Sequence, residues 1–161
     1  ATDEEHGRRV DEDVVERVLP LLAPLCARVF RCGLVPGALR MKLAANHYLI
    51  GMVTVLAETT HAARGARVDL QTLRQVLDAG PMASIVSRAK LDKLVSRDFS
   101  PQAAIRDVST IAELVLGQCQ GSGHGTPLIR HCASLYRQAL TDGHGDEDMA
   151  AVVHAFEPAH P

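Results

Sequence analysis

The sequence predicts an all-α protein: a helical bundle around one long central helix, with a single short strand near the N-terminus. The first observation is that apolar residues recur at three- and four-residue steps along most of the chain. The second is an unusually long periodic segment over residues 37–65. The third is that the short run 27–33, which ends at Gly33, is typical of a strand. A length of 161 residues corresponds to about one domain and allows a real hydrophobic core.

The chain begins with an amphipathic pattern over residues 12–26, which predicts the first helix. Pro20 and Pro24 should kink or shorten that helix, because proline lacks the amide hydrogen that a helix needs. The expected strand, residues 27–33, follows directly. A lone strand cannot satisfy its own backbone hydrogen bonds, so we expect it to need a partner.

The long segment begins after Pro36 and predicts a helix over residues 37–65, interrupted only by Gly51, which a helix tolerates. Such a helix is roughly 42 Å long at about 1.5 Å per residue. A compact domain of this length has a radius of gyration of about 15 Å. The helix must therefore cross the whole molecule or pack against a second copy. We predict a homodimer, because apolar residues around much of this helix are difficult to cover within one small monomer.

Shorter helices are predicted after the long one, and their starts carry recognisable signals. Asp69 and Ser84 are good N-cap residues, and Pro101 suits a first helical position. The expected helices cover residues 69–77, 84–95, 101–121, 126–140 and 146–155. The glycine-rich run 121–125 is predicted to be a loop between helices, because it lacks the strand and the lysine of a phosphate-binding loop.

Composition excludes several classes of function. The formal net charge is −2 and the pI is near 6.5, which is far from the basic profile of a nucleic-acid binder. No run of about 18 apolar residues is present, so a membrane span is not expected. The first residues lack the pattern of a signal peptide, so we expect a cytoplasmic protein. The cysteines form no C-x-x-C pair, which favours buried, reduced thiols over disulfides or a zinc site.

Lys42 and Asn46 are the residues that point most directly to chemistry. They lie four residues apart in the long helix, so their side chains project from one face. A lysine desolvated by apolar neighbours, with an amide beside it to orient a carbonyl or carboxylate, has the parts of a proton donor and its positioning group. On spacing alone, a solvated lysine and a polar spacer are the favoured interpretation.

The run 143–148 combines His144 with three acidic residues and could in principle bind a metal. Acidic residues in the first turn of a helix also complement the helix dipole, and we favour that interpretation. No metal site is therefore predicted. The motifs of serine hydrolases and zinc proteases do not occur in the sequence.

Taken in order, a set of residues spread over about residues 12–153 resembles a known family. They are Glu16 to Leu22, Val29, Phe30, Gly33, Gly37 to Lys42, Asn46, Ala57, Glu58, Gly65, Asp69, Phe99, Arg106, Asp107, Pro127 and Gly143 to Val152. Their order and spacing are similar to those of the β-hydroxyacid dehydrogenases, which include the 3-hydroxyisobutyrate dehydrogenases and the related imine reductases.

The resemblance implies roles for three residues. In that family an N-terminal Rossmann domain binds NAD(P), and a helical C-terminal domain supplies the substrate site and the dimer contacts. Lys42 would match the catalytic lysine that protonates the carbonyl oxygen, and Asn46 would match the asparagine that orients the substrate. Arg106 falls where the family usually has a lysine near the cofactor, and arginine keeps that charge with a different geometry.

One feature of the family is absent, namely the G-x-G-x-x-G motif that holds the pyrophosphate. By resemblance, residues 1–33 would be the remnant of the end of a Rossmann-type domain, and residues 34–161 a helical substrate and dimerisation domain. NAD(P) is implied only by the family and is not expected to bind this chain alone; a Rossmann-domain partner would hold it. We therefore expect part of an oxidoreductase acting on a small carbonyl or imine substrate. The alternative is a stand-alone helical domain, either a dimerisation module or a cofactor-free acid/base enzyme.

Overall fold

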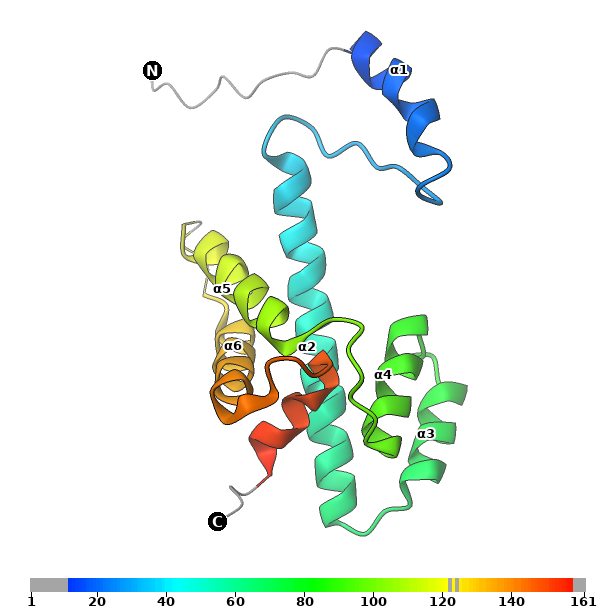
Figure 1. The fold of residues 1–161 in the computed structure, drawn as a ribbon, viewed down its shortest axis with the longest axis vertical. Coiled ribbons are helices and arrows are strands. Elements are labelled where there is room, and N and C mark those ends of the chain that lie inside the picture. Colours follow the sequence, from blue (N-terminus) through cyan, green and yellow to red (C-terminus); the bar gives the residue numbers. More distant parts are fainter. Residues whose placement is uncertain (1–11, 122, 124, 158–161) are drawn as a thin grey trace. The chain divides into compact units, whose positions relative to one another are not determined.

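The computed structural model describes residues 12–121, 123 and 125–157, and every regular element in that part of the chain is a helix (Figure 1). The elements are α1 (Glu12–Leu22), α2 (Gly37–Gly65), α3 (Leu70–Ala79), α4 (Ile85–Ser96), α5 (Ile105–Gly121), α6 (Pro127–Ala139), the π-helix η2 (Leu140–His144) and the 3-10 helix η3 (Met149–Phe156). The predicted all-α fold is confirmed. The chain divides into two compact units, Ala1–Ala45 and Asn46–Pro161.

In the first unit, helix α1 ends at Leu22, four residues before the predicted end. The amides of Leu25 and Cys26 close the last turn by donating to the Leu22 carbonyl at 2.9 and 3.1 Å. The helix stops here because Pro24 has no amide hydrogen with which to continue the ladder. Pro20 is accommodated inside α1.

The predicted strand over residues 27–33 is not formed, and these residues are irregular. A lone strand cannot satisfy its backbone hydrogen bonds, and the described part of the chain contains no second strand to pair with it. The fold-class prediction was therefore wrong on this element. Residues 1–11 of the predicted remnant lie outside the described residues.

Helix α2 has the predicted bounds, Gly37–Gly65. It ends where Arg67 adopts a left-handed backbone with φ 59°, while the Val68 amide donates to the Ala63 carbonyl at 2.9 Å. In the second unit, one face of α2 is fully buried at steps of three and four residues. That face consists of Ile50, Val53, Ala57 and Thr60.

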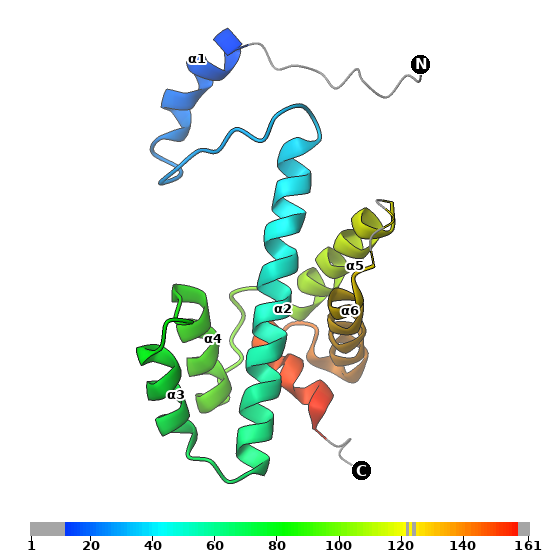
Figure 2. The same cartoon turned by 180° about the vertical axis from the view of Figure 1, so that it is seen from behind.

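The second unit surrounds this buried face of α2. Helices α3 and α4 lie on one side of α2 and helices α5 and α6 on the other, and the view from behind shows the same division (Figures 1 and 2). Helix η3 packs against α4, α5 and α6 and closes the core. Tyr136 of α6 is completely buried and donates its hydroxyl hydrogen to the Met149 carbonyl at 3.2 Å. This burial raises the pKa of Tyr136, so its phenol remains neutral.

The capping predictions for the next two helices are confirmed. The Asp69 carboxylate accepts from the Thr72 amide at 2.7 Å at the start of α3. At the start of α4, Ser84 accepts from the Ser87 amide at 3.0 Å, and the Ser87 hydroxyl accepts from the Ser84 amide at 2.8 Å. This reciprocal pair is a capping box, with serine in place of the more usual acidic residue.

Helix α5 begins at Ile105 and not at Pro101, because the backbone before it forms hydrogen bonds with residues 147–149. The Met149 amide donates to the Ala103 carbonyl at 2.7 Å, and the Ile105 amide donates to the Glu147 carbonyl at 2.9 Å. Ala104 and Asp148 form an isolated antiparallel bridge. The same pairing shortens the last predicted helix, which begins at Met149 as a 3-10 helix.

A buried ion pair holds this crossing of segments together. Lys90 Nζ of α4 lies 2.9 and 2.8 Å from the two carboxylate oxygens of Asp148, and these side chains are 6% and 0% exposed. The same carboxylate accepts from the backbone amides of Gln102 at 2.9 Å and Ala150 at 3.1 Å. Burial by itself would raise the pKa of Asp148, but the bonds from Lys90 and these amides outweigh it and lower that pKa.

Glu157, at the C-terminal end of η3, is the second charged anchor. Arg97 forms two hydrogen bonds with its carboxylate, at 2.6 and 3.1 Å, and Nδ1 of His154 lies 2.9 Å from it. Arg64 Nη1 is 3.6 Å away. The bonds from Arg97 and His154 outweigh partial burial and lower the pKa of Glu157 from 4.5 to about 2.

We predict that removing either charge of the buried pair is strongly destabilising. Asp148→Ala and Lys90→Ala should each lower the free energy of unfolding by roughly 3–5 kcal/mol, because each leaves an uncompensated buried charge. Urea unfolding followed by circular dichroism measures the change. The matched control is Glu113→Gln, which breaks the exposed pair between Glu113 and Arg137 and should cost less than about 1 kcal/mol. Similar losses in all three variants would contradict a buried, coupled pair.

The lowered pKa of Glu157 makes a prediction about acid stability. A depressed carboxyl pKa stabilises the folded protein above the ordinary value of 4.5, and that contribution is lost as pH falls from there toward about 2. Glu157→Gln should therefore be less stable than the wild type at neutral pH, with the difference shrinking over this acidic range. Urea unfolding at a series of pH values measures it. A stability difference that does not vary with pH would refute the assignment.

Candidate functional site

Lys42 and Asn46 lie on helix α2, four residues apart and therefore on one face of the helix. Lys42 is exposed and Asn46 is half-buried. The helix supplies the spacing that the sequence predicts. The desolvation expected for Lys42 is not observed, since its side chain is exposed.

Arg106, the third predicted residue, lies in the first turn of α5 beside the turn that follows η2. Its backbone amide donates to the Gly145 carbonyl at 3.1 Å, and its Nε donates to the same oxygen at 3.4 Å. Its guanidinium also forms an ion pair with Asp146, and the Arg106 side chain is 54% exposed. The structure therefore holds Arg106 as a surface cation on a fixed turn.

Two glycines shape this turn. Gly143 has φ 98°, a left-handed conformation that residues with a side chain rarely adopt. At Gly145, an added Cβ would lie 2.8 Å from Leu140 Cδ1 and 3.5 Å from Arg106 Nη2. A side chain at position 145 would therefore require the end of the Leu140 side chain to shift, whereas its distance from Arg106 is an ordinary van der Waals contact.

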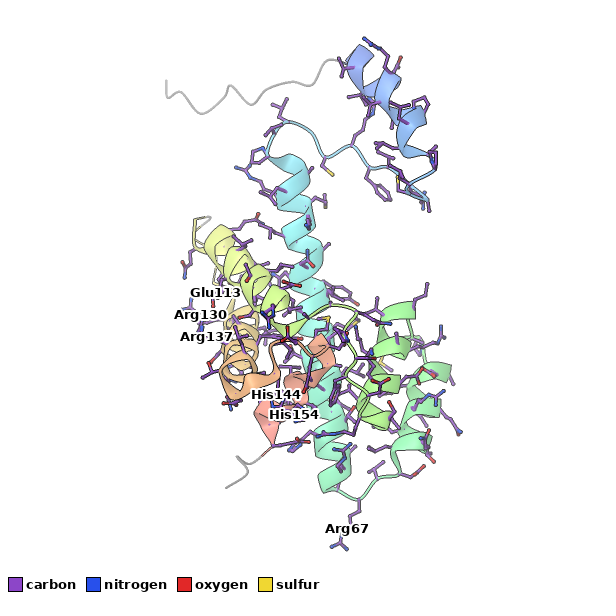
Figure 3. All side chains as sticks on the ribbon, viewed as in Figure 1. Arg67, Glu113, Arg130, Arg137, His144 and His154 are labelled. Carbon is purple, nitrogen blue, oxygen red and sulfur yellow. The ribbon has the colours of Figure 1, made fainter. Side chains whose placement is uncertain are left out.

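Beside the same turn the structure brings together three residues that were not predicted as a group: His144, Glu147 and His154, called here the histidine–glutamate cluster. The two histidines are labelled in Figure 3. His144 Nδ1 lies 3.2 Å from Glu147 Oε1, and His154 Nε2 lies 3.6 Å from Glu147 Oε2. The two imidazole rings stack with their centroids 4.1 Å apart and an interplanar angle of 9°. The edge of Phe99 packs against His154, with ring centroids 5.3 Å apart.

The start of η3 at Met149 corrects part of the helix-dipole interpretation of the run 143–148. Asp146 and Glu147 precede η3, whereas Asp148 caps it by accepting from the Ala150 amide, which agrees with that interpretation. The spacing of His144 and Glu147, three residues apart, is a local signal that sequence reasoning could use. No such signal exists for His154, because nine residues of turn and 3-10 helix lie between it and His144.

The four cysteines form no disulfide, as predicted, but their thiols are not all buried. Cys132 is buried and Cys119 and Cys32 are half-buried, whereas Cys26 is exposed, so the prediction of burial was wrong there. Cys26 Sγ donates to the Leu22 carbonyl at 3.3 Å at the end of α1. The neighbouring residues 23–31 are exposed as well.

The described residues do not form a dinucleotide-binding fold. Such a site needs a strand, a glycine-rich turn and a helix N-terminus directed at the pyrophosphate. Within the described ranges the regular elements are helices, and a single exposed guanidinium at Arg106 does not replace that arrangement. None of the helices in this part of the chain is long and apolar enough to span a bilayer.

Comparison with known proteins shows which family the chain matches. Residues 38–156 match the family described as "NAD-binding of NADP-dependent 3-hydroxyisobutyrate dehydrogenase". Glyoxylate/succinic semialdehyde reductase 2 of Arabidopsis thaliana is 24% identical over 149 residues, which are 92% of this chain and 42% of that protein. The cytokine-like nuclear factor N-PAC of Homo sapiens is 26% identical over 127 residues, which are 79% of this chain and 23% of that protein.

Solved structures show the same fold. The 3-hydroxyisobutyrate dehydrogenase of Salmonella typhimurium matches with a TM-score of 0.83 and 22% identity, over 89% of this chain and 51% of that one. The Mycobacterium tuberculosis 3-hydroxyisobutyrate dehydrogenase, solved with L-serine, matches with a TM-score of 0.81 and 21% identity, over 92% and 53%. The chain thus spans about half or less of the proteins that it matches. It belongs to the 3-hydroxyisobutyrate dehydrogenase family, as its sequence resemblance predicted.

Proposed function

We propose that this chain is the substrate-binding and dimerisation part of an NAD(P)-dependent oxidoreductase that reduces a small carbonyl or imine compound. The observation that carries the proposal is the placement of Lys42 and Asn46, four residues apart on α2, within a chain whose residues 38–156 match the family. The Arabidopsis relative is named as a reductase of glyoxylate and succinic semialdehyde, which supports a small carbonyl acid as the substrate class.

The proposed chemistry assigns one task to each side chain. Lys42 donates a proton from its ammonium group to the carbonyl oxygen, or to the imine nitrogen, while hydride adds to the adjacent carbon. The products are an alcohol or amine and a neutral lysine, which regains its proton from solvent. The Asn46 amide donates a hydrogen bond that holds the substrate in place, and this fixes the reacting atom near Lys42.

The nicotinamide nucleotide would supply the hydride when bound, and in this proposal it is held by a separate Rossmann-type unit. The described helices fit only an accessory contact with it, through the guanidinium of Arg106. Arginine binds phosphate oxygens in a bidentate manner, so Arg106 could exchange its exposed partner Asp146 for a nucleotide phosphate. A covering unit would also provide the apolar surroundings that Lys42 lacks in this chain.

The dimerisation part of the proposal rests on an apolar surface in the second unit. A cavity of about 220 Å³ lies between α2, α3 and α4 and is lined by Val55, Leu56, Met82 and Leu91, among others. Large apolar side chains on or flanking it are strongly exposed. They are Val55 at 60%, Val76 at 62%, Met82 at 69% and Ile85 at 87%. Such a surface is typical of one that a second copy covers.

A stand-alone helical domain is the second candidate, and two observations favour it. Lys42 is exposed in this chain, and the human relative is named as a nuclear factor and not as an enzyme. In this case the fold would serve as a dimerisation module or perform cofactor-free acid/base chemistry. The two candidates differ in whether Lys42 is needed for an NADPH-dependent reaction.

The role of Lys42 can be tested by substitution. The chain, joined to a nucleotide-binding unit of the family, should oxidise NADPH with glyoxylate or succinic semialdehyde as substrate. Lys42→Ala should reduce kcat about 10²–10⁴-fold, because a positioned general acid contributes that much. The matched control is Arg40→Ala, which removes an exposed cation two residues away on α2. Equal activity of Lys42→Ala and the wild type would reject the general acid, and no activity in any variant would favour the stand-alone domain.

The dimer can be tested by light scattering of the chain at micromolar concentration. The wild type should give particles of twice the 17.3 kDa chain mass. Ile85→Asp should shift them to the monomer, because it places a charge on the apolar surface. Leu128→Asp is the control, since Leu128 is 78% exposed on α6, outside that surface. Wild-type particles of only 17.3 kDa would contradict the proposal.

A further inference from the structure

We propose that the histidine–glutamate cluster, His144, Glu147 and His154, is a binding site for a zinc ion. Two imidazole nitrogens and one carboxylate oxygen are a donor set that zinc commonly takes from proteins. Each residue offers one such atom, and the three atoms all lie within 4.8 Å of one another. The inference does not depend on the proposed reductase function.

The distances between donors agree with this interpretation. Two ligands bound tetrahedrally to zinc at about 2.0–2.1 Å lie about 3.3 Å apart. His144 Nδ1 is 3.2 Å from Glu147 Oε1, and His154 Nε2 is 3.6 Å from Glu147 Oε2. Both distances from Glu147 are therefore close to the separation of two zinc ligands.

One donor atom is left without a hydrogen-bond partner by the fold. Glu147 Oε2 is buried and accepts no hydrogen bond, although its carboxylate as a whole is partly exposed. A buried carboxylate oxygen without a partner is costly in free energy. A cation at this point would satisfy that oxygen, which is an independent indication that something binds there.

The surroundings of His154 are those of a metal ligand. Its Nδ1 lies 2.9 Å from Glu157, and a carboxylate can only accept, so this nitrogen carries the proton. The opposite nitrogen, Nε2, is then the one that can offer a lone pair to a metal ion, and it faces Glu147. Arg97 holds Glu157 in place through two hydrogen bonds. In zinc sites, a histidine ligand commonly donates its other ring N–H to a carboxylate in this way.

His144 must turn to complete the site. The two rings are nearly parallel, with an interplanar angle of 9°, and parallel planes cannot both contain one ion. The His144 side chain is 26% exposed, so its ring has solvent on one side into which it can rotate. Zinc would then bind the lone pair of His144 Nδ1, and the proton of the neutral imidazole would sit on Nε2.

Three protein ligands leave the fourth tetrahedral position to water. The ligands come from the end of η2, from the turn after it and from η3, so the ion would fasten that turn to η3. Because the ligands come together only in the folded chain, zinc would stabilise the fold in proportion to its saturation.

The test is titration of the chain with zinc by calorimetry, after accessible cysteine thiols have been blocked with iodoacetamide. One zinc ion should bind per chain, and the melting temperature should rise because zinc binds only the folded chain. Cobalt should give the visible absorption of a tetrahedral nitrogen and oxygen site. His144→Gln and His154→Gln should each weaken binding at least tenfold, and Glu157→Gln should weaken it about 10–100-fold.

His131→Gln is the matched control, because His131 is an exposed histidine on α6, away from the cluster in sequence and element. It should bind zinc like the wild type. The His144→Gln variant retains the Glu157 anchor, so it keeps the test valid if substitution at His154 or Glu157 impairs folding. Absence of saturable zinc binding by the folded wild type, or unchanged binding by His144→Gln, would overturn the proposal.

Discussion

The bond between Lys90 and Asp148 is the constraint on which the rest of the second unit depends. Fifty-eight residues separate the two side chains in sequence, and both are almost completely buried. Asp148 also accepts from the amide of Gln102 and caps η3 through Ala150. One carboxylate therefore fixes α4, the segment before α5 and the start of η3. Its several bonds offset the cost of burying its charge.

Arg106 and the histidine–glutamate cluster are both positioned by the contacts of Asp148. The segment that Asp148 anchors includes Glu147 and continues back to the Gly145 carbonyl, which holds Arg106. The same anchor sets where η3 begins and hence where His154 faces Glu147. The site on α2 has a different origin: the spacing of Lys42 and Asn46 follows from the helix alone.

The sequence predicted the features that depend on local pattern. The bounds of α2 and the caps at Asp69 and Ser84 follow from periodicity and hydrogen-bonding side chains close in sequence. It failed where distant segments compete for the backbone: the bridge between Ala104 and Asp148 delays α5 and turns the last helix into a 3-10 helix. The histidine–glutamate cluster and the partner of Lys90 were missed for the same reason. No local pattern encodes a contact between segments that meet only after folding.

In the proposed reductase, this chain donates the proton and a separate unit binds the nucleotide. Calorimetric titration of the chain alone with NADPH tests that division most directly, because it needs neither a substrate nor a partner. We expect no saturable binding at micromolar concentrations of nucleotide, since one surface arginine on a helical fold cannot hold a dinucleotide. A sub-micromolar dissociation constant for the chain by itself would contradict the account.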